Sequence, residues 1–352
     1  MILGDLSAEL ARLLNSLAAT GALPRAAASL TASGTWRQAA GPSPGRYVTS
    51  LPFELASLSA RPPQAAAALL ATELTRLAWV SAAEPDGGYL TITVTPAHLA
   101  ALPARIVAAG SAAARSEALA GLELTAPYPP DLAATPTWQQ AWRAQHAAIV
   151  GRLGDAAGAH VLFFHSESKA AGESTAKAHV GDPPVAVAYF GLDAVRFALA
   201  AASTPRPAVI ERQLSSPLDL TNPLVMIAHA RADAASTPRW AADLGLLADE
   251  RPGQARTLEP PESRLIDVMS WLPERIAAAY RRRRPADLVG YLEHLARAWL
   301  DCSESCSVLP FRGRGAGGSL AGIASRLELA EAASTTLTAG LGLIGVAAPA
   351  MM

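Results

Sequence analysis

Apolar side chains in the first hundred residues recur mainly at helical spacing. Five leucines between positions 6 and 17 share this spacing: Leu6, Leu10, Leu13, Leu14 and Leu17. They predict an amphipathic helix that begins near Asp5 or Ser7 as a cap and stops at Gly21. Residues 45–50 lead into a second apolar helix, and Pro62 opens a third.

The pattern changes after the glycine turn at residues 86–88, where Leu90, Ile92 and Val94 alternate with polar positions. This alternation predicts a strand that is buried on one face. A proline-rich turn at 127–136 then precedes a predicted helix over 138–153 and a short apolar run at 161–164. A strand–helix–strand unit takes roughly 30 residues, so residues 111–190 hold two units at most and not a complete doubly wound domain.

The second half of the chain has helical spacing throughout. We expect Asp193, Asn222 and Ser263 to cap the first three helices and Pro285 to open the fourth. About 30 residues between the second and third helices are expected to form a mobile loop. The inward positions are Leu265, Ile266, Met269, Leu272 and Ile276 in the third helix, Leu288, Leu292, Leu295 and Trp299 in the fourth, and Ile323, Leu327, Ala330, Leu337 and Leu341 in the last. The pattern predicts a mainly α protein with a smaller α/β part, ending in a helical bundle.

Composition limits the function classes. The chain has 352 residues and a formal net charge of −1, which argues against a general binder of DNA or other polyanions. No apolar run approaches the ~18 residues that span a membrane, and acidic residues interrupt the first apolar positions. We therefore expect no membrane segment and no signal peptide. Cys302 and Cys306 have no histidine nearby, so we expect reduced thiols in a cytoplasmic protein.

Motifs in the last half resemble those of arginyl-tRNA synthetases. Residues 191–197 (GLDAVRF) are similar to the D-A-(V/L)-R-F helix that opens the all-helical, DALR-type anticodon-binding domain of that family. Residues 222–223 (NP) and 227–231 (IAHAR) are similar to its next helix, and residues 340–352 (GLGLIGVAAPAMM) to its last residues. The resemblance implies an anticodon-type domain over 191–352.

A weaker resemblance covers the rest of the chain. Residues 45–50 (GRYVTS) and the strand near residue 90 are similar to a turn and a strand of the family's N-terminal additional domain, which contacts the outer corner of tRNA. Residues 152–158 (RLGDAAG) are similar to the end of the first helix of the catalytic core. The resemblance implies an α+β additional domain at 1–110 and a truncated, Rossmann-like remnant of the class I core at 111–190.

The two ATP-binding signatures of class I synthetases are degenerate. By the spacing of the resemblance, H-x-G-H falls on Thr137, Trp138, Gln139 and Gln140, where both histidines and the glycine are absent. K-M-S-K falls near 174–177, where Lys177 is the one lysine retained. In the family these cations hold phosphates and stabilise developing charge. We predict no catalytic residue and no cofactor; ATP would be needed only if the chain were an enzyme.

Other site chemistry is sparse. The seven histidines include no H-x-x-x-H pair and no cysteine–histidine metal spacing, so no metal site is predicted. His160 and His165 flank the apolar run at 161–164, where they line one end of a remnant sheet or are surface residues. Residues 313–318 satisfy the letters of G-x-G-x-x-G but follow a helix, which favours a linker.

Arginines supply the candidate RNA contacts. Arg281, Arg282, Arg283 and Arg284 form the densest charge, between two predicted helices, where guanidinium groups can reach phosphates. The alternative is a helix C-terminus that favours cations, followed by a solvated turn. The resemblance adds His229 and Arg231, whereas the tyrosines that the family carries just before that motif are absent.

Three functional hypotheses remain open. The first is a synthetase-like paralogue without catalytic signatures, which binds tRNA and does not aminoacylate. The second is a functional arginine–tRNA ligase of shortened form. The third is a scaffold that reuses the helical bundle to bind a protein partner; the near-neutral charge fits this hypothesis better than RNA binding.

Overall fold

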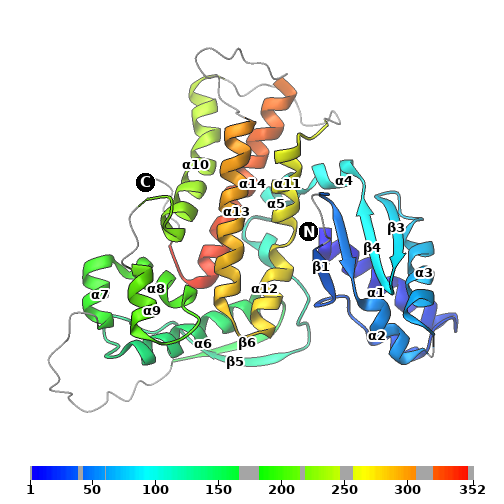
Figure 1. The fold of residues 1–352 in the computed structure, drawn as a ribbon, viewed down its shortest axis with the longest axis horizontal. Helices are drawn as coiled ribbons and strands as arrows, with labels where there is room; N and C mark the ends of the chain where they lie inside the picture. Colours follow the sequence, from blue (N-terminus) through cyan, green and yellow to red (C-terminus); the bar gives the residue numbers. More distant parts are fainter. Residues whose placement is uncertain are drawn as a thin grey trace.

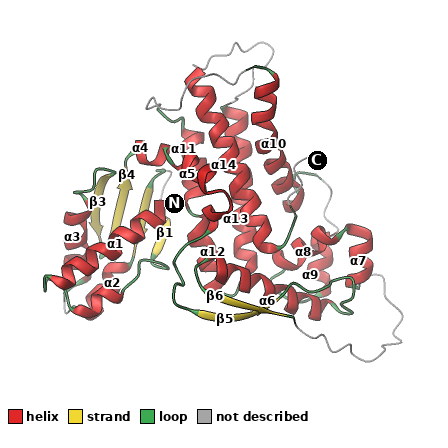
Figure 2. Ribbon diagram, turned by 180° about the vertical axis from the view of Figure 1, so that it is seen from behind, coloured by secondary structure: helices red, strands yellow, loops and turns green. Residues whose placement is uncertain are grey.

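The computed structural model describes residues 2–38, 43–59, 61–165, 182–214, 219–245, 257–306 and 320–347. An α+β unit at the N-terminal end lies beside a long helical bundle (Figure 1). A small parallel strand pair lies at the end of the bundle that contains α12 (Leu272–Arg281) and α6 (Trp138–Ala156), as Figure 2 shows from behind. The chain is mainly helical with a smaller sheet part, as the sequence predicts.

The N-terminal unit has four antiparallel strands in the order β1-β2-β4-β3. Helices α1 (Ile2–Ala19), α2 (Leu51–Leu58) and α3 (Pro63–Leu74) pack with it, and a 3₁₀ turn, η1 (Arg25–Ser29), follows α1. The strands are β1 (Trp36–Gln38), β2 (Arg46–Thr49), β3 (Val80–Asp86) and β4 (Tyr89–Val94). Helix α1 begins earlier than expected, because Ile2 and Leu3 extend its buried stripe; Asp5 and Ser7 are inside it and do not cap it.

Residues 46–49 form a strand and not the turn that the resemblance implies. Tyr47 lies opposite Ile92, and Thr49 lies opposite Leu90. Tyr47 and Thr49 are both fully buried. They lie two positions apart and so face the same side of the strand, because successive strand residues alternate between the two sides. The pairing with β4 therefore places Tyr47 in the core between this sheet and the helical bundle.

The segment after β4 joins the sheet to the bundle. It contains α4 (Pro96–Ala100), α5 (Leu102–Ala109) and a 3₁₀ turn, η2 (Gly110–Ala114). Both α5 and η2 pack against the last helix, α14 (Leu320–Ile344). By length and composition alone, the stretch Pro96–Ala114 could span a membrane. In this fold it is broken into three short pieces, and Leu102 and Ile106 are buried in the protein core.

The described part of residues 111–190 contains one strand–helix–strand unit. Strands β5 (Glu123–Pro127) and β6 (His160–Phe164) are parallel, with Glu123 opposite His160, and α6 (Trp138–Ala156) connects them. Gly151 lets α6 approach β5 closely, because a Cβ there would collide with the side chain of Ala126. One helix, α7 (Pro183–Phe190), follows the residues that the structure does not describe.

The remaining helices form the C-terminal bundle, in which α10, α11, α13 and α14 pack together. Their bounds are α8 (Leu192–Ala201), α9 (Pro207–Leu214), α10 (Pro223–Asp243), α11 (Pro260–Ser270), α12 (Leu272–Arg281), α13 (Pro285–Ser305) and α14 (Leu320–Ile344). Every inward position predicted for α13 is buried. Helix α10 continues to Asp243, so it includes much of the stretch expected to be a loop.

Helix starts differ from the prediction at two of four positions. The side chain of Asn222 accepts a hydrogen bond from the Leu224 amide at 3.0 Å, and Pro285 opens α13, both as predicted. Asp193 instead lies in the first turn of α8, where its negative charge interacts favourably with the helix dipole, but its side chain does not cap the helix. Ser263 lies inside α11, which is capped by a reciprocal pair of Glu259 and Glu262.

The third predicted helix is two helices, α11 and α12, which meet at Trp271. Pro273 has no amide hydrogen, and its ring would collide with the carbonyl of Met269 in a continuous helix. After the break, α12 packs against α6 and α13. The rings of Tyr47 and Trp271 pack in a tilted arrangement with centroids 5.8 Å apart across this junction, and the Tyr47 hydroxyl lies 3.0 Å from Ser270 Oγ.

Candidate nucleic-acid interface

The four consecutive arginines form the end of α12 and the turn into α13. The Arg284 amide donates to the Ala279 carbonyl at 3.0 Å, and the Arg283 amide donates to Tyr280 at 2.9 Å. This pair of bonds is a Schellman motif, which requires a left-handed residue after the C-cap. Arg283 takes that conformation with φ of 53° and is the non-glycine residue with positive φ in the described part of the chain.

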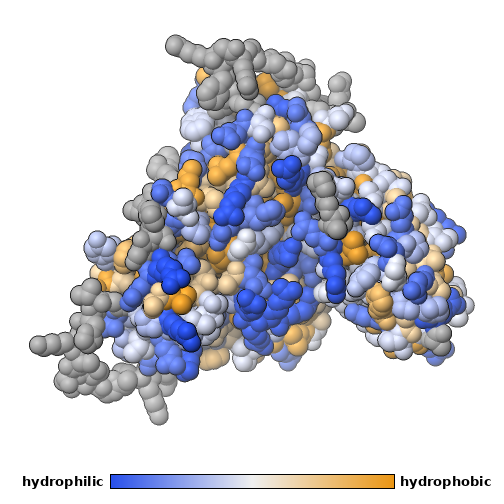
Figure 3. All heavy atoms as spheres, viewed as in Figure 1, coloured by the Kyte–Doolittle hydropathy of each residue, from blue (hydrophilic) through white to orange (hydrophobic). Residues whose placement is uncertain are grey.

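All four arginines are exposed, and the side chains of Arg282, Arg283 and Arg284 contact residues near this turn. Arg282 and Arg284 share one carboxylate, that of Asp287, at 3.2 and 3.5 Å. The guanidinium of Arg283 lies 5.1 Å from the centre of the Tyr280 ring. All three are exposed, and Figure 3 shows hydrophilic residues gathered over this end of the bundle. Three cations with one carboxylate form a basic surface that can contact phosphates. We call residues 282–284 the arginine turn.

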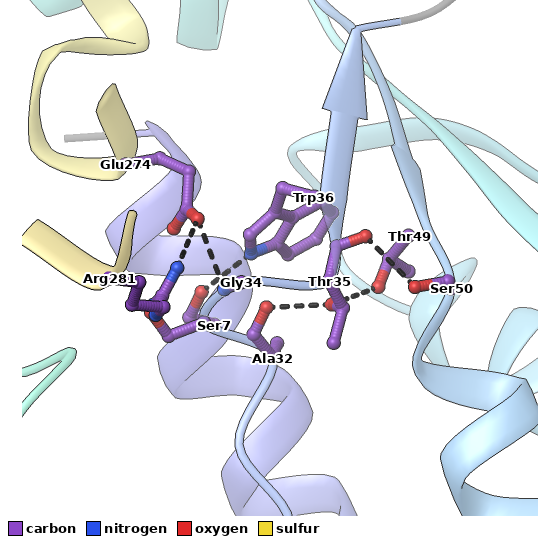
Figure 4. Close-up of polar contacts among 10 residues, drawn as sticks. Ser7, Ala32, Gly34, Thr35, Trp36, Thr49, Ser50, Glu274 and Arg281 are labelled. Carbon is purple, nitrogen blue, oxygen red and sulfur yellow. Dashed lines mark hydrogen bonds and ion pairs between the residues drawn. The ribbon is translucent and has the colours of Figure 1, made fainter. Parts of the chain in front are cut away.

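Arg281 has a different role, since its side chain turns toward the N-terminal unit (Figure 4). It pairs with Glu274 at 3.1 Å and also donates to the Ser33 hydroxyl. Glu274 accepts a further hydrogen bond from the Gly34 amide at 3.0 Å. Burial raises the pKa of Glu274, and the neighbouring Arg281 partly offsets that rise. Arg281 therefore holds the two units together and is not presented to a ligand as the other three are.

A second polar contact crosses the same junction. Asp267 accepts a hydrogen bond from the Gly45 amide at 3.0 Å. Burial raises the pKa of Asp267, and this hydrogen bond partly offsets the rise. Sequence reasoning missed Asp267 and Glu274, because contacts between residues more than 200 positions apart leave no local pattern.

His229 and Arg231 lie on α10, apart from the arginine turn. His229 is exposed, whereas Arg231 is only 5% exposed, and burial lowers its pKa with a further contribution from Arg239. Helix α10 packs against α13 and α14, while α12 packs against α6 and α13. The predicted RNA-contact residues are thus divided among the arginine turn, the domain junction and α10, where Arg231 points away from solvent.

The positions of the first degenerate signature start α6. The Thr137 hydroxyl accepts a hydrogen bond from the Gln140 amide at 3.3 Å, as an N-cap does. Trp138 is buried among Leu132 and Val195, whereas Gln139 and Gln140 are exposed. Lys177 lies outside the described residues. Thr137 and Trp138 thus have structural roles at the helix start.

The other chemical candidates are also placed. Within the described ranges no group of three histidine, cysteine or acidic residues is arranged to hold a metal. Cys302 and Cys306 are free and buried, and burial raises the pKa of Cys302 to about 12, so it is a neutral thiol. His160 and His165 are exposed, and His165 stacks on Tyr128. The glycine-rich residues 313–318 lie outside the described part.

Comparison with known proteins identifies the bundle. Residues 225–352 match the DALR anticodon binding domain family. The chain is 34% identical over 163 residues to an arginine–tRNA ligase of Frankia alni and 30% identical over 167 residues to one of Paenarthrobacter aurescens. The second half of the chain thus carries a DALR-type domain and is similar to arginine–tRNA ligases. These matches cover 46% and 47% of this synthetase-like chain but only 29% and 30% of the two ligases.

The fold of the synthetase-like chain is also similar to that of a solved structure. The Thermus thermophilus arginyl-tRNA synthetase matches with a TM-score of 0.56 and 14% identity, covering 99% of this chain and 100% of that one. At this identity the likeness concerns the fold alone. It supports the predicted combination of an α/β part with a helical anticodon-type domain.

Proposed function

We propose that this synthetase-like protein binds tRNA through its DALR-type domain and does not aminoacylate it. The observation that carries the proposal is the DALR match over 225–352, a region that presents the arginine turn to solvent. Exposed guanidinium groups on a short turn suit contacts with consecutive phosphates. His229 is exposed on α10 as a further contact. The protein would act in the cytoplasm.

Two features of the chain argue against aminoacylation of tRNA. Positions 137–140 carry none of the cations that the class I signature uses on phosphates, and Thr137 and Trp138 serve the start of α6. The described part of the core remnant contains one parallel strand pair, whereas a doubly wound nucleotide-binding domain has about six strands. ATP is therefore not a cofactor of the proposed function.

The test is retention of total tRNA on filters by purified protein at about 50 and 200 mM salt. Each phosphate contact contributes a slope of about 0.7–0.9 in log affinity against log salt, so the fourfold rise weakens binding by roughly threefold per contact. We expect the triple variant Arg282→Gln, Arg283→Gln, Arg284→Gln to bind more weakly and to lose about two to three units of that slope.

The control removes the same charge elsewhere. Arg115, Arg143 and Arg206 are exposed and lie outside the arginine turn, so their triple glutamine variant should keep the wild-type slope. Equal losses in both variants would refute the arginine turn as the contact surface. Parallel reactions with ATP, arginine and tRNA should yield no charged tRNA. Charging would instead support the alternative of a functional arginine–tRNA ligase.

The strand pair favours a second candidate function, a scaffold for a protein partner. Parallel sheets are normally covered on both faces. Here Leu162 is 60% exposed and Phe164 is 48% exposed, both on β6, and Tyr128 is exposed just after β5. Absence of tRNA binding at low salt, with the fold intact, would leave this candidate in place of the first.

A further inference from the structure

Helices α6 and α8 pack against each other and against the last helix, α14 (Figure 1). At the last turn of α14 they bring two arginines together. Arg152 comes from α6, and Arg196 comes from α8. Both belong to motifs that resemble the synthetase family, yet neither has a role in the proposed tRNA surface. Gln145, also on α6, lies beside them at the same turn.

All three side chains contact the end of α14. Gln145 Nε2 donates to the Ile344 carbonyl at 3.1 Å, and Arg196 Nη1 donates to the Gly345 carbonyl at 3.1 Å. The guanidinium of Arg152 lies directly against Gly345, since a Cβ there would be 2.9 Å from Nη2 and 3.0 Å from Nη1. Gly345 has a φ of 82°, so glycine suits both the backbone and the close approach.

Several polar atoms in this cluster are buried and have no hydrogen-bond partner among the residues that the structure describes. They are Arg152 Nε and Nη2, Arg196 Nε, and Gln145 Oε1. Buried polar atoms in folded proteins are almost always satisfied, so this concentration in one place indicates a missing partner. Three of the four atoms are donors on cations, and one is an acceptor on an amide.

Charge points to the nature of that partner. Burial lowers the pKa of Arg152 to about 10, with a contribution from Arg196, and Arg152 still remains charged at neutral pH. The carboxylate that the structure places near them is Asp193, 4.0 Å from Arg196 and half exposed. The α14 carbonyls supply only partial negative charge. Two neighbouring, half-buried guanidinium groups are therefore undercompensated among the described residues.

We propose that Arg152, Arg196 and Gln145 form a binding site for a phosphate group at the end of α14. Guanidinium groups bind phosphate oxygens through paired, charge-assisted hydrogen bonds. A phosphate that carries a proton also offers a hydroxyl to Gln145 Oε1, which a carboxylate does not. The site is separate from the arginine turn, and a group bound there would join α6 and α8 to the last turn of the bundle.

The test uses inorganic phosphate as the probe. The melting temperature of the full chain is measured by scanning fluorimetry in phosphate-free buffer, with phosphate added at constant ionic strength adjusted by sodium chloride. At ten times the dissociation constant we expect a saturable rise of about 2 °C for a protein of this size. Isothermal calorimetry on the wild-type protein measures the same binding directly. A parallel arm with adenosine monophosphate separates free phosphate from a phosphate ester.

Variants connect the effect to the site. Arg152→Met and Arg196→Met should each abolish the rise, whereas Arg143→Met, an exposed position on α6, should keep it. Without phosphate, Arg152→Met should melt no lower than the wild type, because it removes a buried like charge. A phosphate response equal to the chloride response would overturn the proposal, as would an unchanged response in both site variants or a response to acetate alone.

Discussion

Removal of Glu274 tests the contact between the N-terminal unit and the bundle. Glu274→Ala deletes two hydrogen bonds to a carboxylate, from the Gly34 amide at 3.0 Å and from Arg281 at 3.1 Å. Hydrogen bonds to charged groups contribute about 1.5–3 kcal/mol each, and exposed ion pairs contribute at most about 1 kcal/mol. The Arg281 side chain is 32% exposed and that of Glu274 is 11% exposed. We therefore expect their ion pair to contribute about 1 kcal/mol.

Burial of the Glu274 carboxylate reduces the stabilisation by these hydrogen bonds, because burial disfavours the ionised form and so raises the pKa of that group. We therefore expect Glu274→Ala to lower the free energy of unfolding by about 2 kcal/mol, close to 3 °C in melting temperature for a chain of this length. Urea unfolding followed by circular dichroism measures the loss. An unchanged slope with urea would indicate that the two units still unfold together.

The matched control is Glu293→Ala on α13. Glu293 is half-buried and pairs with the exposed Arg297 at 3.4 Å on the same helix face, an i,i+4 pair expected to contribute about 0.5 kcal/mol or less. A double-mutant cycle of Glu274→Ala with Arg281→Ala should give a coupling above about 0.5 kcal/mol. Equal losses for Glu274→Ala and Glu293→Ala, or no coupling in the cycle, would refute this reasoning.

Two further predictions concern the turn and the junction. Arg283→Gly should raise the free energy of unfolding by up to about 1 kcal/mol, because glycine takes a positive φ without strain; a loss would mean that the contact with Tyr280 outweighs the strain. The raised pKa of Asp267 means that the native state binds a proton more tightly than the unfolded chain, so wild-type stability falls as pH rises from about 4 through the raised value. Asp267→Asn keeps an acceptor for Gly45 and should remove this fall; urea titrations between about pH 4 and 7 that keep the wild-type slope would contradict it.

Local sequence patterns were sufficient to predict the long helices and the central strand. Leu288, Leu292 and Leu295 repeat at helical spacing and are all buried in α13. The alternation at Leu90 and Ile92 corresponds to β4, which has a neighbour on each side. Strands β1 and β3 were missed because they are edge strands with few buried positions, so their sequences lack the apolar alternation of a half-buried strand.

The candidate site was only partly accessible to sequence reasoning. The density of Arg281 to Arg284 marked the correct turn, but four identical side chains gave no means to separate their roles. The structure separates Arg281 because Glu274 and Ser33 lie beside it. Arg231 was chosen by resemblance alone, and the packing of α10 against α13 and α14 leaves it buried.

The sequence by itself determined the helical class of the chain, the start of α10 at Asn222 and the similarity of its second half to arginyl-tRNA synthetases. These features depend on residues close together in the chain, so periodicity, caps and motifs can be recognised from the sequence. The tertiary structure alone decided which arginines face solvent and which polar atoms meet at the end of α14. Those outcomes depend on burial and pairing between helices distant in sequence, and burial sets the energy of a charge only after the chain has packed.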